Sequence, residues 1–200
     1  MPPASLFAGG GFVNEHAGMV FPAAYAATPI LLDLVEYGRR PRIKAAALGL
    51  VFDALCFLPL AGLNRVDTAY GSNVPLCCAM ARHIRTRRPA ALLAHRRYGR
   101  QLLEEAALHW RLTIEETEET ELQPDGGLTA IADLEGAPFP TPVEAELSVP
   151  PFTQRALTVR IDTLTADPSG AACIQLTPAP AAFVVPGAPL HSAECGLREH

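Results

Sequence analysis

Apolar residues recur every three or four positions through most of the first half of the chain, which is the spacing of one face of a helix. Gly38, Pro59 and Pro89 stand where successive runs of this pattern stop. The pattern therefore predicts four helices, paired as two helical hairpins. The predicted helices cover Pro22–Tyr37, Ile43–Leu58, Val74–Arg88 and Ala90–Trp110.

The second half of the chain changes to a period of two. Apolar and polar residues alternate through Val143–Val149 and again through Leu157–Asp162, as expected of strands with one buried face. Turn-forming residues such as those of Asp167–Gly170 separate the segments. Weaker strand candidates are Trp110–Glu116, Leu128–Leu134, Ala172–Thr177 and Ala182–Val185. The pattern predicts a small antiparallel sheet or sandwich.

The predicted fold class is α+β, with an all-α N-terminal part followed by a small antiparallel β-rich region. We expect a helical domain over residues 1–110, an acidic β-rich region over 111–186 and a flexible tail over 187–200. The 200 residues, 49% of them apolar, are enough for one large domain or two small ones.

Composition favours a cytoplasmic protein. The N-terminal residues lack a basic segment followed by a continuous apolar run, which is the signature of a secretory signal. The most apolar stretch, Ala45–Leu63, is interrupted by Asp53 and Pro59 and is not expected to span a membrane. Five cysteines without a disulfide-like spacing indicate reduced thiols.

The charged residues are distributed unequally along the chain. The first 100 residues hold 12 Lys and Arg against 5 Asp and Glu, whereas the last 100 hold 4 against 16. The basic residues concentrate in Arg82–Arg100, and the acidic residues concentrate in Glu115–Glu121. This split indicates charged partners more than it indicates a fold.

Both charged clusters are candidate partner-binding surfaces. The arginines, with Tyr98 available for stacking, suit a phosphate backbone. Alternatively, they belong to a solvated helix pair that faces the acidic segment of the same chain or an acidic partner. The acidic residues form either a solvated edge or loop, or a surface for a basic partner, since complementary charge speeds association. The candidates are Arg82, Arg85, Arg88, Arg96, Arg97, Arg100, Glu115, Glu116, Glu118, Glu119, Glu121 and Asp125.

The segment His16–Ala23, followed by Ala27–Leu34, resembles the H-x-G-x-V-Y-x-A…A-x-P-F-L-x-x-L opening of bacterial HEAT-repeat-like proteins. The similarity covers about residues 10–110, with Phe21 in place of the usual Tyr and Met19 where Thr is common. The resemblance implies a helical-repeat fold. Because some members accompany polymorphic toxins as immunity proteins, it also implies neutralisation of a toxin by binding.

The residues of this motif have structural interpretations of their own. Gly18 is expected to permit a close approach of the backbone, and Pro22 to start a helix. Pro29 should kink that helix or mark its first turn. His16 either braces the turn by hydrogen bonding or contacts a partner.

Catalytic and metal-binding patterns are weak. Cys77 and Cys78 stand near His83, but on the predicted helix Cys77 lies on the apolar face and His83 nearly opposite, which favours core cysteines. His191 and Cys195 have a ligand-like spacing, yet two donors do not complete a zinc site. We therefore expect no catalytic residue, no metal and no cofactor.

The function predicted from the sequence is non-enzymatic protein binding, most concretely by an immunity protein that occludes the active site of a basic toxin. Such a protein is expected to be a monomer or a dimer. A nucleic-acid-associated protein that uses the arginine-rich helices is an alternative. A structural or assembly subunit is another, and an enzyme is a third.

Overall fold

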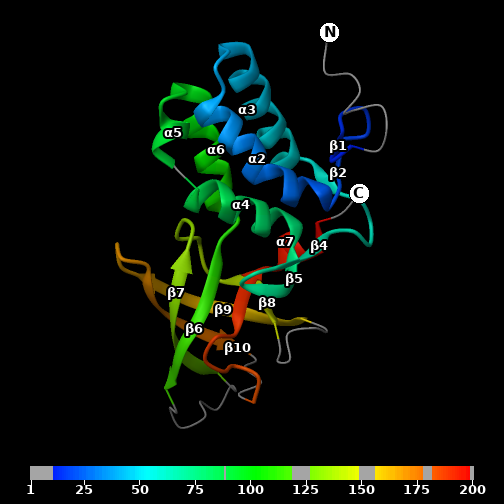
Figure 1. Cartoon of the computed structure of the whole chain (residues 1–200). Helices are drawn as coiled ribbons and strands as arrows, with labels where there is room; N and C mark the ends of the chain where they lie inside the picture. Colours follow the sequence, from blue (N-terminus) through cyan, green and yellow to red (C-terminus); the bar gives the residue numbers. More distant parts are fainter. Residues whose placement is uncertain (1–10, 88, 119–126, 149–155, 178–181, 199–200) are drawn as a thin grey trace. The chain divides into compact units, whose positions relative to one another are not determined.

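A computed structural model describes residues 11–87, 89–118, 127–148, 156–177 and 182–198 (Figure 1). The chain divides into two compact units. We name the helical unit the one that comprises Met1–Thr68, Val74–Ala107 and Arg198–His200. The barrel unit comprises Ala69–Asn73 and Leu108–Leu197.

Five helices and a small sheet form most of the helical unit's described residues. In Figure 1, α2 and α3 run side by side. The helices are α2 (Ala23–Tyr37), α3 (Pro41–Cys56), α4 (Leu76–Thr86), α5 (Pro89–Leu93) and α6 (Arg96–Leu108). The sheet consists of β1 (Val13–Asn14), β2 (Met19–Val20) and β3 (Leu58–Pro59). Fully buried Leu55, Met80, Ile84, Leu92 and Leu102 belong to the core that these elements share.

The helix predicted over Ala90–Trp110 is in fact two helices, α5 and α6. Arg96 has a φ of 55°, a left-handed conformation that interrupts the helical path between them. The two helices then approach closely at Gly99, where an added Cβ would lie 1.8 Å from the carbonyl oxygen of Leu92. Glycine is required there because no side chain fits.

The motif around Gly18 forms the turn between β1 and β2. Gly18 has a φ of 62° and an added Cβ would meet no atom within 4 Å, so its role is backbone conformation and not the close approach that we expected. His16 is exposed, and Asn14 Oδ1 accepts a hydrogen bond from the Ala17 N–H at 3.3 Å. Pro29 lies inside α2, which continues past it.

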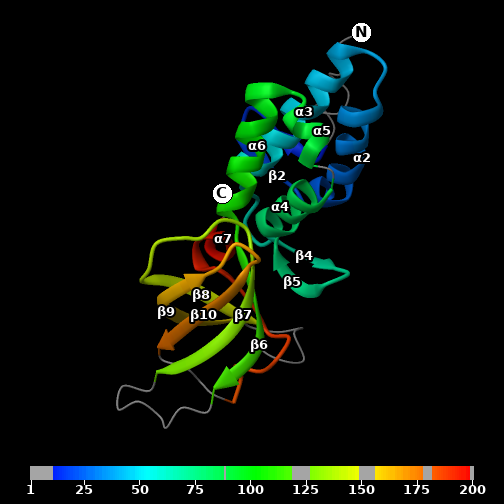
Figure 2. The ribbon, with the colours of Figure 1, turned by 90° about the vertical axis from the view of Figure 1, so that its left-hand side faces the viewer.

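Six strands of the barrel unit close into an antiparallel barrel, in the order β10-β7-β6-β11-β8-β9 (Figure 2). The strands are β6 (Arg111–Glu118), β7 (Leu128–Glu135), β8 (Val143–Ser148), β9 (Ala156–Ala166), β10 (Ala171–Thr177) and β11 (Pro189–Ser192). A short helix, α7 (Ala193–Leu197), follows β11. Alternate residues such as Leu112, Ile114, Ile174 and Leu176 are fully buried, which is the alternation that the sequence pattern indicated.

The predicted fold was wrong in its architecture. The second half of the chain is a closed six-stranded barrel and not a small sheet or sandwich, and the helices before it do not form a HEAT-like repeat. The protein is thus neither HEAT-like nor predominantly α-helical. Residues 187–200 were expected to be a tail, yet β11 pairs with both β6 and β8 and completes the barrel. The first three of the four residues of β11 are all buried, so this strand has no alternation by which it could be recognised.

Two short strands lie between α3 and α4. They are β4 (Arg65–Thr68) and β5 (Gly71–Pro75), which form a two-stranded sheet. The tight turn Asp167–Gly170 does join β9 to β10 as its residues indicated. There Asp167 Oδ1 accepts hydrogen bonds from the Ser169 N–H at 2.7 Å and the Ser169 hydroxyl at 2.6 Å.

Candidate functional site

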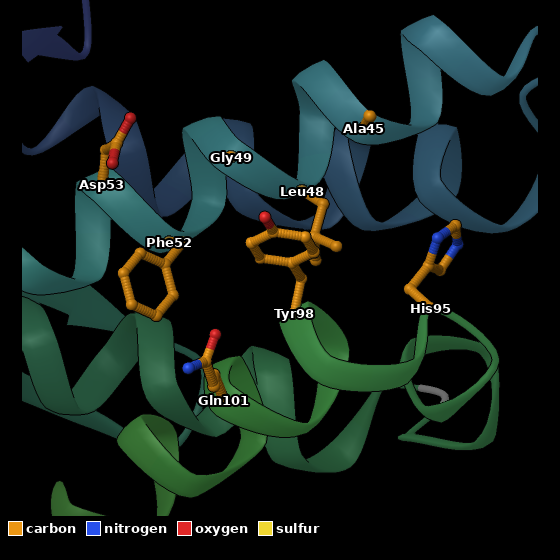
Figure 3. A pocket seen from close by; sticks show the side chains of 8 residues that line it. All are labelled: Ala45, Leu48, Gly49, Phe52, Asp53, His95, Tyr98 and Gln101. Atoms are coloured by element: carbon orange, nitrogen blue, oxygen red, sulfur yellow. The ribbon is translucent and has the colours of Figure 1, made fainter.

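A groove with a volume of about 510 Å³ lies between α3 and the start of α6 in the helical unit (Figure 3). Helix α3 forms one side of it. The loop before α6 and the first turns of α6 form the other. The lining residues are Ala45, Leu48, Gly49, Phe52, Asp53, His95, Tyr98 and Gln101.

Small residues on α3 create this space. Ala45 and Gly49 lie one helical turn apart on the exposed side of α3, and a Cβ added at Gly49 would meet nothing within 4 Å. Leu48 and Phe52 extend the apolar surface beside them. Figure 3 shows the rings of His95 and Tyr98 reaching from the α6 side toward α3.

Polar groups are few and lie around this apolar surface. Burial, followed by the negative charge of Glu15, raises the pKa of the Asp53 carboxyl above its ordinary value. His95 Nε2 lies 3.4 Å from the carbonyl oxygen of Val35, which orients the imidazole. The Tyr98 side chain remains 71% exposed. An apolar surface with a few convergent polar groups is typical of a binding site, and such sites occupy about 300–1,000 Å³.

A second hollow, on the barrel unit, is smaller and its polar groups bind one another. It has a volume of about 190 Å³ and is lined in part by Arg160, Asp162 and Thr177. Arg160 Nε donates to Asp162 Oδ1 at 2.6 Å, and the Thr177 hydroxyl donates to Asp162 Oδ2 at 2.5 Å. Because both oxygens of this carboxylate already accept hydrogen bonds, the α3–α6 groove is the better candidate.

The arginines expected to form one basic surface have different environments. Arg85 Nη1 donates to the Ala106 carbonyl oxygen at 2.5 Å, a contact within the helical unit. Arg82 is half-buried. Arg96, Arg97 and Arg100 are exposed on α6 beside the groove. Arg88 lies outside the described residues.

The predicted acidic surface is described only in part. Glu115 and Glu116 are both exposed on β6, because a register irregularity between Ile114 and Glu116 breaks the alternation of the strand. Glu118 ends β6, but its side chain is outside the description. Glu119, Glu121 and Asp125 lie outside the described residues.

Cys77 and Cys78 are both buried, and the His83 ring stacks on the Tyr25 ring with centroids 4.8 Å apart. Burial, then the charges of Arg87 and Arg82, lowers the pKa of His83. His109 Nδ1 lies 3.1 Å from Cys195 Sγ, a contact that the sequence does not predict. Their separation of 86 positions gave no local signal.

The groove residues are also not predicted by the sequence pattern, in which Ala45–Leu63 stands out only as an apolar stretch. The available signal was the pair of small residues Ala45 and Gly49, followed one turn later by Asp53, on the outward side of a helix. These positions leave a helix surface without large side chains and place one carboxyl group at its edge.

No protein-family model, curated protein or solved structure matches this chain. Across the described residues, no helix combines the length and the apolar character needed to cross a bilayer.

Proposed function

We propose that the protein is a non-enzymatic binding protein that receives an apolar side chain and an adjacent cationic group of a protein partner in the α3–α6 groove. The observation that carries the proposal is the groove itself: an apolar surface about 510 Å³ in volume with one carboxyl group among its lining residues.

The apolar part of the groove supplies affinity. Burying one large aliphatic or aromatic side chain contributes about 1.5–3 kcal/mol before the costs of association. Leu48, Phe52 and Tyr98 offer the partner both aliphatic and aromatic surface. A groove of this size accepts one or two side chains of a peptide segment.

Asp53 supplies the preference for a cation. Its raised pKa means that burial and Glu15 make the ionised carboxylate less favourable than in water. A lysine or arginine of the partner placed beside Asp53 would offset both effects. The expected partner segment therefore combines an apolar residue with a basic neighbour.

We do not propose that the protein is an immunity protein. That role depended on the resemblance to HEAT-repeat-like proteins, and the helices of this chain do not form such a repeat. The present proposal depends only on the groove and its lining.

One observation favours nucleic acid as a second candidate partner. Exposed Arg96, Arg97 and Arg100 share α6 with exposed Tyr98, a combination that suits a single strand bound by charge and stacking. Binding of this kind falls steeply with salt, whereas apolar contacts in the groove do not. Titration of a fluorescent oligonucleotide at two salt concentrations distinguishes the two candidates.

The proposal is tested by selecting a random peptide library against the purified protein and measuring the affinity of the selected peptides by fluorescence polarisation. The expected peptides pair an apolar residue with Lys or Arg. Their affinity for Asp53→Asn should be about two- to fivefold lower, as expected for a partly exposed ion pair.

Two outcomes would overturn the proposal. One is a selection that enriches no peptide. The other is a set of peptides that lack a basic residue and bind Asp53→Asn as well as they bind the unaltered chain. The Glu104→Gln variant is the matched control, because Glu104 is an exposed carboxylate on α6 that does not line the groove.

A further inference from the structure

The turn between α2 and α3 concentrates positive charge at the surface of the helical unit. Arg39, Arg40 and Arg42 are all exposed. Over residues 38–52 the chain contains no Asp or Glu. We name Tyr37–Ile43 the basic turn, and Figure 1 shows its position where α2 ends and α3 begins. Its positive charge contrasts with the net charge of −5 of the whole chain.

The described part of the fold makes no use of the three guanidinium groups. None of them forms a hydrogen bond or an ion pair with another residue that the structure describes. Arg40 is the N-cap residue of α3, yet its side chain makes no capping hydrogen bond. Lys44 differs, because its Nζ donates to the Glu36 carbonyl oxygen at 2.6 Å and so satisfies the end of α2. The arginine charges are therefore available to an anionic partner.

Acidic residues on α2 offset this charge only in part. Asp33 and Glu36 precede the turn, and Asp33 Oδ2 lies 3.7 Å from Arg87 Nη2. Residues 33–44 hold four basic side chains against two acidic ones. The surface around the basic turn thus keeps an excess of positive charge.

Large apolar side chains are exposed beside the same arginines. Tyr37 is 61% exposed and Ile43 is 43% exposed, and they flank the arginines in the sequence. Leu34, one turn of α2 before Tyr37, is 40% exposed. Neighbouring apolar side chains that remain exposed mark interaction surfaces in proteins. The basic turn therefore offers both charge and apolar area to one partner.

We propose that the basic turn docks the protein on a membrane surface that contains anionic lipids. Surface binding of this kind combines apolar side chains at the boundary of the acyl chains with electrostatic attraction to anionic headgroups. Each arginine close to such a surface strengthens binding about fivefold. A tyrosine ring suits the headgroup region. The aliphatic stem of an arginine lies along apolar surface while its guanidinium group remains at the phosphates.

A lipid surface suits the turn better than nucleic acid does. Both offer phosphates to the arginines. A single strand also offers bases, which stack on aromatic rings such as that of Tyr37. It has no aliphatic layer that would bury Leu34 and Ile43, whereas the membrane interface has one. Nucleic acid is accordingly a competing outcome of the test.

The test is co-sedimentation of the full-length protein with phosphatidylcholine vesicles that contain or lack phosphatidylserine. We expect binding only to the vesicles with phosphatidylserine, and weaker binding as salt is added. The triple variant Arg39→Gln, Arg40→Gln and Arg42→Gln should bind these vesicles at least about tenfold more weakly. Because the three side chains are exposed, this variant should keep the circular dichroism spectrum of the unaltered protein.

A second triple variant separates the effect of the turn from that of total charge. Arg96→Gln, Arg97→Gln and Arg100→Gln removes the same charge from exposed positions of α6. It should bind the vesicles with phosphatidylserine nearly as the unaltered protein does. Equal losses from the two triple variants would overturn the proposal, because binding would then follow total charge and not the basic turn.

The apolar contribution has its own matched pair of variants. Ile43→Ser should weaken binding about three- to tenfold, because a serine side chain gains little at the acyl boundary. Leu63 is 44% exposed elsewhere in the helical unit, and Leu63→Ser should bind normally. The proposal is also overturned if the unaltered protein does not bind the vesicles with phosphatidylserine, or if it binds a fluorescent oligonucleotide in their place. None of these results depends on the groove, which has no lining residue in the basic turn.

Discussion

The two units of this protein differ in how many of their large apolar side chains are exposed to solvent. Of the twelve large hydrophobic side chains that are exposed among the described residues, eight belong to the helical unit and four to the barrel unit. The eight include Ile30, Leu34 and Tyr37, which follow one side of α2 at intervals of four and three residues, and Tyr98 at the groove.

The difference follows from how each unit completes its core. A closed barrel pairs every strand on both sides and directs one of every two side chains inward, so its apolar face is enclosed by its own closure. A few helices of modest length cannot cover one another on all sides. Surface left uncovered on α2 and α3 is thus available to a partner, whereas the barrel core is not.

The largest effect is expected in the barrel core. Ile174→Ala removes a fully buried side chain of β10 and should lower the free energy of unfolding by about 3 kcal/mol. Ile131→Ala removes an isoleucine that is 38% exposed on neighbouring β7 and should cost less than about 1 kcal/mol. Urea unfolding measures the stability of both variants. Equal losses of unfolding free energy would contradict the assignment of Ile174 to the inside of the barrel and Ile131 to the outside.

The next effect compares a thiol of each unit. Burial, then the charge of Glu105, raises the pKa of Cys56 to about 11 from an ordinary value of 9.0. At pH 8 this lowers the thiolate fraction of Cys56 about a hundredfold. Iodoacetamide should therefore alkylate exposed Cys173 of the barrel much faster than Cys56, as measured by mass spectrometry of tryptic peptides. Similar alkylation rates for Cys56 and Cys173 would contradict the raised pKa of Cys56.

A smaller effect separates two glycines of the helical unit. Gly99→Ala forces a Cβ against the Leu92 carbonyl group and should destabilise the protein by about 1–3 kcal/mol. Gly49→Ala meets no atom and replaces glycine inside α3, so it should stabilise the protein by about 0.5–1 kcal/mol. Thermal unfolding checks the two signs. A stabilising Gly99→Ala would contradict the close approach of α5 and α6.

The smallest effect compares a carboxyl group in each unit. The Thr177 hydroxyl, with Arg160, lowers the pKa of Asp162, whereas burial and Glu15 raise that of Asp53. Asp162 therefore contributes stability above its unfolded pKa, and this contribution is lost as the pH falls through its folded pKa. Ionised Asp53 instead lowers stability at neutral pH, and that cost disappears as the pH falls. NMR titration should place Asp53 above Asp162, and the reverse order would contradict both environments.

Most individual elements could be predicted from the sequence, because each has a period long enough to recognise. α2, α3 and β6 to β10 all lie where apolar spacing placed them, to within a few residues. The barrel could not be predicted, since its closure depends on β11, whose four residues carry no readable alternation. The break at Arg96 was also hidden, because a left-handed arginine has no sequence signature.

The candidate site was the least predictable part. Charge drew attention to Arg82–Arg100 and Glu115–Glu121, but the groove depends on small residues of α3 facing residues on and just before α6. Small residues are recognised as a feature only when the structure shows what lies opposite them. The same holds for His109 and Cys195, which only the fold brings together.

The central claim is that the α3–α6 groove is the binding surface, and two tryptophan variants test it most directly. Ala45 and Ala46 are adjacent and exposed on α3, but only Ala45 lines the groove. The measurement is the affinity of a peptide selected on the unaltered protein, determined by fluorescence polarisation for Ala45→Trp and Ala46→Trp. We predict that Ala45→Trp fills the groove and weakens binding by at least about tenfold, while Ala46→Trp binds normally. Equal affinities for the two variants would contradict the claim.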